Sequence, residues 1–142
     1  MSGLVTIFGG SGSSRVAIDF LNVADVLTIH VDQIERYGGD PGIRDLGLLE
    51  SAVAQGRATF DGKPLHEFPF ETAAAYMFHL VKNHPFVDGN KRTGAAAALV
   101  FLDFNGVEIE ALPGQVFDMT MAVATGLADK GAVAQFFQRS VR

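Results

Sequence analysis

Residues 70–104 read FETAAAYMFHLVKNHPFVDGNKRTGAAAALVFLDF, and this stretch predicts the centre of the fold. Apolar side chains cover nearly all sides of residues 70–81 and of residues 90–104, as is typical of helices that are surrounded by protein. Pro85 separates the two runs, because a residue that precedes proline avoids helical backbone angles. We therefore expect two buried helices joined by a short loop, with His84 at the end of the first helix or on the loop.

Shorter amphipathic helices are expected on both sides of this pair. Asn22 and Asp45 carry short polar side chains that can cap a helix, and each precedes apolar residues at helical spacing. Residues 107–112 alternate apolar and acidic side chains, which favours a strand-like link. The additional helices are expected near residues 23–37, 46–54, 114–125 and 130–141. The fold class that follows is all-α.

A small β-hairpin or flap is expected over residues 58–68. Asp61-Gly62 at its centre is a favoured tight-turn pair, although Pro64 limits regular strand pairing. His66 follows this turn and is expected to be exposed.

Residues 1–19 precede the expected domain, which spans residues 20–142. They begin MSGLVTIFGGSGSS, a short β-like apolar run followed by glycine and serine. A dinucleotide-binding loop is the least favoured interpretation, because residues 9–15 lack the third glycine of that fingerprint and no alternation of strands and helices follows. The segment is expected instead to be a flexible extension, a linker or an added edge strand.

Composition is typical of a small soluble protein. A chain of 142 residues, of which 48% are hydrophobic, is long enough for one core and too short for two ordinary domains. No apolar run approaches the roughly 20 residues of a membrane-spanning helix. The absence of cysteine excludes disulfides, thiolate metal sites and a cysteine nucleophile, and it fits a reducing cytoplasm. The formal net charge of −5 gives no broad basic field, which disfavours direct nucleic-acid binding as the primary role.

The loop between the two buried helices carries a high density of polar groups. A helix that begins near Asn90 presents unpaired N–H groups and the positive end of its dipole, which together favour an anion such as phosphate. Gly89 lets the backbone approach a phosphate closely, while Lys91 and Arg92 add positive charge and donors. These residues are therefore candidates for a phosphate site.

Two further side chains of the loop suggest chemistry at that site. Asp88 can hold a divalent cation such as Mg²⁺, which is typically bound by one or two carboxylates together with phosphates. Histidine is the side chain whose ordinary pKa suits proton transfer from a hydroxyl at neutral pH, so His84 is the candidate base. The same two residues could belong to a transition-metal site, but no third ligand stands at a suitable spacing.

Each of these residues also has an ordinary structural explanation. A single histidine before proline is more often a cap or a packed side chain than a base, and a Lys-Arg pair at a helix start is usually solvated. The combined spacing from His84 to Arg92 favours a functional interpretation instead. His30 and His79 lie on apolar helical faces and are expected to be structural.

The segment HPFVDGNKRT, residues 84–93, resembles the signature of the Fic/Doc family. Its Asn90-Lys91-Arg92 version is similar to the Doc branch, the death-on-curing toxins of toxin–antitoxin modules. The resemblance extends over about residues 20–138. It includes RYGG at residues 36–39, PGIRD at residues 41–45 and NGV at residues 105–107.

The resemblance implies a single-domain helical bundle with a small hairpin flap, and it assigns roles within it. The base would be His84, the Mg²⁺ ligand Asp88, and the anchor of the loop in the core Phe86. ATP would supply the nucleotide. The phosphate-binding residues would be Gly89, Asn90, Lys91 and Arg92, and the flap that aligns the target would carry Asp61, Gly62 and Lys63.

The resemblance also bears on the group that is transferred. In AMP-transferring Fic enzymes the signature typically reads Gly-Asn-Gly-Arg with a second arginine three residues later, whereas this chain has Lys91 and Ala95 at those positions. The missing phosphate ligand favours phosphate transfer from ATP to a protein hydroxyl. Doc proteins, which this chain resembles, use ATP to phosphorylate a threonine of elongation factor Tu, and this modification blocks translation. AMP transfer to a protein is the second possibility.

Control of such an activity is expected to come from outside the chain. The sequence lacks the Ser/Thr-x-x-x-Glu-Gly/Asn inhibitory motif of self-restrained Fic proteins. The resemblance therefore implies a separate antitoxin, whose disordered tail would fold against a groove on the domain. An inactive nucleotide-binding or antitoxin-binding module is a third possibility, against which the intact His84 argues.

Overall fold

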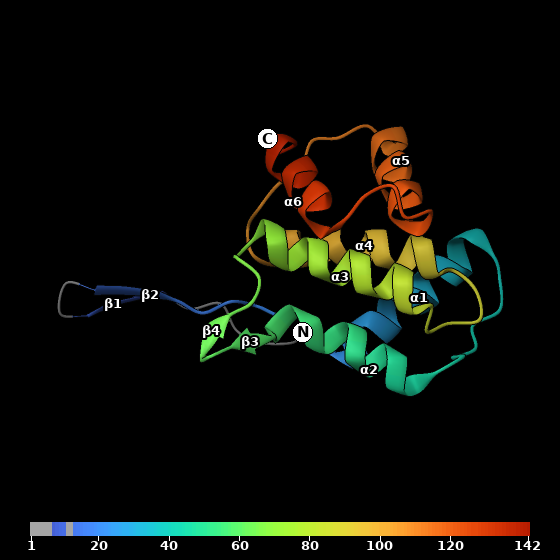
Figure 1. Cartoon of the computed structure of the whole chain (residues 1–142), viewed down its shortest axis with the longest axis horizontal. Helices are drawn as coiled ribbons and strands as arrows, with labels where there is room; N and C mark the ends of the chain where they lie inside the picture. Colours follow the sequence, from blue (N-terminus) through green and yellow to red (C-terminus); the bar gives the residue numbers. More distant parts are fainter. Residues whose placement is uncertain (1–6, 11–12) are drawn as a thin grey trace.

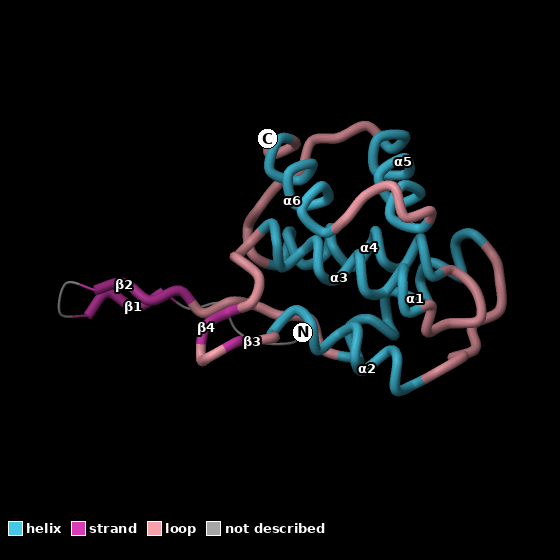
Figure 2. Tube along the Cα trace, viewed as in Figure 1, coloured by secondary structure: helices cyan, strands magenta, loops and turns pink. Residues whose placement is uncertain are grey.

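The computed structural model describes residues 7–10 and 13–142. Within these ranges the chain is mostly helical and carries two small antiparallel hairpins (Figures 1 and 2). The helices are α1 (Val23–Tyr37), α2 (Leu46–Ala54), α3 (Phe70–Asn83), α4 (Asn90–Phe104), α5 (Pro113–Ala124) and α6 (Lys130–Arg139), with the 3-10 turn η1 (Gln55–Arg57) after α2. The expected all-α fold with a small β-hairpin is confirmed.

Helices α3 and α4 lie at the centre of the bundle, as their apolar sequences predict. In Figure 1, α5 and α6 cover one side of this pair, while α1 and α2 lie on the other side. The two central helices approach each other closely at Gly94, where an added Cβ would lie 2.8 Å from Val81 Cγ2 and 3.1 Å from the carbonyl oxygen of Met77. A side chain at this position would therefore force α3 and α4 apart.

Two helices begin at the capping residues that the sequence predicts. The Asn22 side chain accepts a hydrogen bond from Asp25 N at 2.8 Å, and the Asp45 side chain accepts one from Leu48 N at 2.9 Å. These bonds satisfy backbone donors that have no partner within the helix. At the other end, α1 stops at Gly38, which has a φ of +87° that glycine adopts without strain.

Strand pairing is more limited than the sequence suggests. In the expected hairpin, β3 (Thr59–Phe60) pairs with β4 (Lys63–Pro64) over two residue pairs only. Pro64 has no N–H to extend the ladder. Residues 107–112 form no strand, and their only pairing in the described residues is the bridge between Ile109 and Val141.

The N-terminal segment forms a hairpin of its own instead of adding an edge strand to another sheet. Strand β1 (Ile7–Gly10) pairs with β2 (Ser13–Val16), and the pair projects from the helical body in Figure 1. Residues 11–12 of the glycine-rich stretch lie outside the described residues. Among the residues that are described, no helix is both long and apolar enough to cross a bilayer.

His66 was expected to be exposed, and this expectation is wrong. Only 9% of the residue is accessible, and its Nε2 has no partner among the described residues. Burial, together with the positive charge of Lys130, lowers the pKa of His66. His66 lies between β4 and α3 and close enough to α6 to feel the charge of Lys130, so the fold covers it.

His79 on α3 lies beside the same lysine. Lys130 Nζ is 3.1 Å from His79 Nε2, and because an ammonium group can only donate, this ring nitrogen accepts and the ring is neutral. Burial and the charge of Lys130 lower the pKa of His79 to about 4. The folded protein therefore resists protonation of this ring.

Acid should destabilise the fold through His79. The unfolded chain takes up the proton near the ordinary pKa of 6.5, whereas the folded chain does so only near 4. The stabilisation is therefore complete above about pH 6.5 and is lost progressively as the pH falls toward 4. Urea unfolding at pH 7 and pH 5 should show a smaller loss of stability for His79→Gln than for the wild type. An equal loss would contradict this assignment.

Candidate active site

The loop between α3 and α4 is held in a conformation that helices do not use. Pro85 ends α3, and His84 adopts left-handed backbone angles with φ +52°. Gly89, at the start of α4, is also left-handed with φ +79°. A left-handed conformation costs a residue with a side chain roughly 1–2 kcal/mol, so contacts around His84 must offset this strain.

The connection between α1 and α2 supplies many of those contacts. Arg44 N and Asp45 N donate to the carbonyl oxygen of Pro85 at 2.7 and 3.0 Å, and Val87 N donates to that of Gly42 at 3.0 Å. The two segments thus run antiparallel like short strands. Residues 42–45, which are distant in the sequence, thus fix the outer side of the α3–α4 loop.

Arg44 adds a side-chain clamp at the end of α3. Its Nε donates to the carbonyl oxygen of His84 at 2.7 Å, and its Nη2 donates to that of Asn83 at 3.0 Å. Basic side chains commonly satisfy the last carbonyls of a helix in this way. Arg44 follows a Pro-Gly turn in the sequence. The local pattern around it does not indicate a contact with the end of α3.

Phe86 and Asn90 hold the inner side of the loop. Phe86 is fully buried, and Asn90 is 5% exposed. The amide of Asn90 accepts from Phe86 N and donates to the carbonyl oxygen of Phe86, both at 2.9 Å. One N–H and one lone pair of the Asn90 amide are therefore used within the loop, and its backbone N–H is a further group that Asn90 can offer a phosphate.

The first turn of α4 has the properties of an anion site. In the described part of the chain, no acceptor is bonded to the backbone N–H groups of Asn90, Lys91 or Arg92. Lys91 is exposed. The positive end of the helix dipole and the charge of Lys91 therefore both lie at the start of α4.

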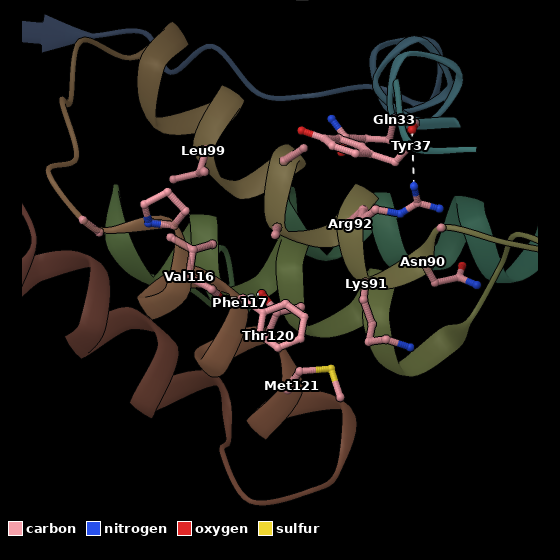
Figure 3. A pocket seen from close by; sticks show the side chains of 15 residues that line it. Gln33, Tyr37, Asn90, Lys91, Arg92, Leu99, Val116, Phe117, Thr120 and Met121 are labelled. Carbon is pink, nitrogen blue, oxygen red and sulfur yellow. Dashed lines mark hydrogen bonds between the residues drawn. The ribbon is translucent and has the colours of Figure 1, made fainter. Parts of the chain in front are cut away.

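Arg92 is partly engaged elsewhere. Its Nη2 donates to the carbonyl oxygen of Gly38 at 2.9 Å, and its Nη1 reaches that of Gln33 at 3.5 Å, the bond drawn in Figure 3. The guanidinium group also lies 5.6 Å from the ring centre of Tyr37. These contacts tie Arg92 to the end of α1, but its five N–H groups leave donors for a ligand.

Asp88 has one carboxylate oxygen fixed and one available. Asp40 N donates to Oδ2 at 2.8 Å, which orients the carboxylate. No described residue bonds Oδ1, and the side chain is exposed. The described residues contain no group of three His, Cys, Asp or Glu side chains placed to hold a metal ion. A cation at Asp88 would therefore need further ligands from phosphate or water, as Mg²⁺ commonly has.

The hairpin residues do not join this site. Asp61, Gly62 and Lys63 lie before the first residue of α3, whereas His84 follows its last residue. A helix of 14 residues spans about 21 Å, and Figure 1 shows the two segments at opposite ends of it. The segment that lies against the loop is residues 40–45, and the role of Asp61, Gly62 and Lys63 in aligning a target stays a prediction.

A cleft of about 810 Å³ opens beside Lys91 and Arg92. Figure 3 shows these cations at one end and Leu99 and Val116 at the other. Its walls come from α1, α4 and α5 and are mostly apolar, and Phe117 on α5 is 64% exposed. A large ligand or a segment of another protein would meet both charge and apolar surface here.

The fold and the loop together define a helical domain in which a polar loop joins the two buried helices and leaves the first N–H groups of α4 without acceptors among the described residues. The sequence model of the Fic/DOC family matches residues 20–102. The chain belongs to this family.

Two relatives show the extent of the similarity. The chain is 44% identical to the toxin Doc of Mycolicibacterium smegmatis over 93 residues, which are 66% of this chain and 69% of that protein. It is 34% identical to the protein kinase doc of Escherichia phage P1 over 115 residues, which are 81% of this chain and 90% of that protein.

Replacing Asn90 should damage the fold, not only the site. Asn90→Ala leaves Phe86 N and the Phe86 carbonyl without partners in a buried place, which should cost about 1–3 kcal/mol of unfolding free energy. Urea denaturation measures this change. Lys91→Ala is the matched control, because this neighbouring side chain is exposed and its loss should change stability by less than about 0.5 kcal/mol. Equal stability of the two variants would show that the two hydrogen bonds between Asn90 and Phe86 do not stabilise the fold.

Proposed function

We propose that this chain is a Doc-like toxin of a toxin–antitoxin module that transfers phosphate from ATP to a protein hydroxyl. The target we favour is a threonine of elongation factor Tu, whose modification would block translation in the cytoplasm. The observation that carries the proposal is the loop itself, where His84, Asp88 and the open start of α4 stand together. The names of the two relatives, one a toxin and one a protein kinase, support the same activity.

In this proposal the start of α4 binds the phosphates of ATP. The N–H groups of its first turn, Lys91 and the free donors of Arg92 would carry the negative charge, which is the main requirement of phosphoryl transfer. The free oxygen of Asp88 would bind Mg²⁺ together with the phosphates. Bound Mg²⁺ would supply additional charge neutralisation.

His84 would act as the general base. Its side chain is exposed, and no described residue forms a hydrogen bond with its ring, although its carbonyl is held by Arg44. The backbone is thereby fixed while the imidazole stays open to a substrate hydroxyl. A base must reach its proton within hydrogen-bond distance, so a fixed backbone with a free ring suits this role.

Ala95 favours phosphate transfer over AMP transfer. It lies one turn further along α4 than Lys91 and lines the cleft. A methyl group at this position offers neither charge nor donor to an additional phosphate. The chain therefore concentrates its phosphate ligands at the first turn of α4.

The cleft gives a place where an antitoxin would act. A partner segment seated between α4 and α5 would cover Lys91 and Arg92 and would bury the exposed ring of Phe117. Such a segment would block phosphate binding without touching His84. Restraint in trans fits a chain without an inhibitory motif of its own.

The transferred group can be weighed directly. Purified protein, Mg²⁺, ATP and elongation factor Tu should give a factor heavier by one phosphate in intact-protein mass spectrometry. His84→Ala should abolish the gain while leaving nucleotide affinity within about threefold, because the base acts on the hydroxyl and not on ATP.

Other outcomes of this assay would redirect the proposal. A gain of one AMP would assign the chain to AMP transfer. No gain with elongation factor Tu, followed by a gain on another protein in a lysate treated with labelled ATP, would overturn only the target. Growth arrest on expression that persists with His84→Ala would contradict toxicity by transfer.

Lys91 should contribute to nucleotide binding without contributing to stability. Lys91→Ala should weaken the affinity for Mg²⁺ and ATP by about tenfold in calorimetry, because one charge–phosphate contact is lost. Lys82→Ala is the control, since Lys82 is an exposed lysine near the end of α3 and lies outside the cleft. Equal affinities of the two variants would argue against phosphate at the first turn of α4.

A further inference from the structure

His30 occupies a position where the helix pattern calls for an aliphatic side chain. The buried residues of α1 are Val26, His30 and Ile34, one on each successive turn of the same face. His30 is 1% exposed. A polar ring in such a place is unfavourable unless its nitrogens find partners.

The ring of His30 contacts the active-site loop at two points. It stacks on the ring of Phe86, with centroids 3.7 Å apart and planes within 6°. Its Nε2 lies 2.8 Å from the carbonyl oxygen of Asp88. Because a carbonyl oxygen can only accept, Nε2 carries the proton and donates. One side chain of α1 thus holds both the anchor of the loop and the peptide that precedes Gly89.

Holding the Asp88 carbonyl fixes the N–H of the next residue. The Asp88–Gly89 peptide is trans and planar, so its C=O and N–H point in opposite directions. The carbonyl faces His30, and the Gly89 N–H therefore faces away from α1. No described residue accepts a hydrogen bond from it. A reversed peptide would instead present a carbonyl oxygen, which repels phosphate.

We propose that His30 is a positioning residue that turns the Asp88–Gly89 peptide so that the Gly89 N–H joins the phosphate-binding groups of α4. This inference rests on the proposed function, because it assigns a further donor to the same nucleotide site. His30 touches neither phosphate nor substrate. It acts through the direction of one peptide, as backbone donors in a preorganised anion site must be aimed before the ligand arrives.

Two variants distinguish the hydrogen bond that His30 donates from the packing of its ring on Phe86. His30→Phe keeps an aromatic ring against Phe86 but removes the donor. His30→Gln places an amide nitrogen at the same distance along the side chain as Nε2 and keeps the donor. Both should fold, as circular dichroism would show. Phosphate transfer should fall by at least about tenfold in His30→Phe and stay within about threefold of the wild type in His30→Gln, because loss of one aimed donor has effects of this order or larger.

The peptide itself can be observed by NMR. On addition of Mg²⁺ and a non-hydrolysable ATP analogue, the Gly89 amide proton of the wild type should shift downfield. The shift should be lost in His30→Phe and retained in His30→Gln. Equal shifts in the wild type and His30→Phe, or equal losses in both folded variants, would overturn the positioning role alone. A wild-type Gly89 amide that does not shift on addition of the nucleotide would overturn this inference alone, because the proposed nucleotide site is tested separately by the calorimetric affinities of the wild type and Lys91→Ala.

The wild-type protein offers a test that needs no variant. The ¹⁵N shifts of the His30 ring should show a protonated Nε2 at neutral pH. An unprotonated Nε2 could not donate to the Asp88 carbonyl and would overturn the inference even if neither variant folded.

Discussion

The burial of Phe86 is the constraint on which the loop of the candidate active site depends. A loop between two core helices has to carry its polar backbone close to the apolar interior, where unpaired N–H and C=O groups are costly. Phe86 anchors the loop in that interior, and the amide of Asn90 satisfies both backbone groups of Phe86. This arrangement leaves the side chains of His84 and Asp88 outside. The face that we propose to be catalytic is therefore open to solvent because an aromatic ring and an amide hold the opposite face of the loop in the core.

Rigid helices transmit this constraint to the rest of the site. The close contact of α3 and α4 at Gly94 fixes the distance that the loop must span. The left-handed angles at His84 and Gly89 then follow from a short chain that has to reverse direction. Arg44, reaching across from the α1–α2 connection, offsets part of the resulting strain at His84. The proposed site lies at helix ends that the core holds in place, and among the described residues the first N–H groups of α4 remain without acceptors.

The sequence pattern correctly predicted those features, such as helix ends and caps, that depend on residues close together in the chain. Helix α4 begins and ends where the sequence places it, since Pro85 and the Asn105-Gly106 pair act locally. The caps at Asn22 and Asp45 are equally local. Contacts between residues far apart along the chain could not be read in the same way. Periodicity assigned His30 to a buried face but not to the loop that it contacts, 58 residues away, and it gave no sign that His66 is covered. The hairpin is the clearest example of a spatial relation that periodicity does not give, because the full length of α3 lies between it and His84.

Arg92 connects the proposed phosphate site to the packing of α1. Its guanidinium group already neutralises carbonyls at the negative end of the α1 dipole, at Gly38 and Gln33. A phosphate at the start of α4 would compete for the same charge, so binding would be coupled to the contact between these two helices. Lys91 is exposed, and no described residue forms a hydrogen bond or an ion pair with its side chain. The two basic residues of one dipeptide are therefore not equivalent in the proposed function. The charge of Lys91 would be available to the ligand alone, whereas the charge of Arg92 would be shared between the ligand and the fold.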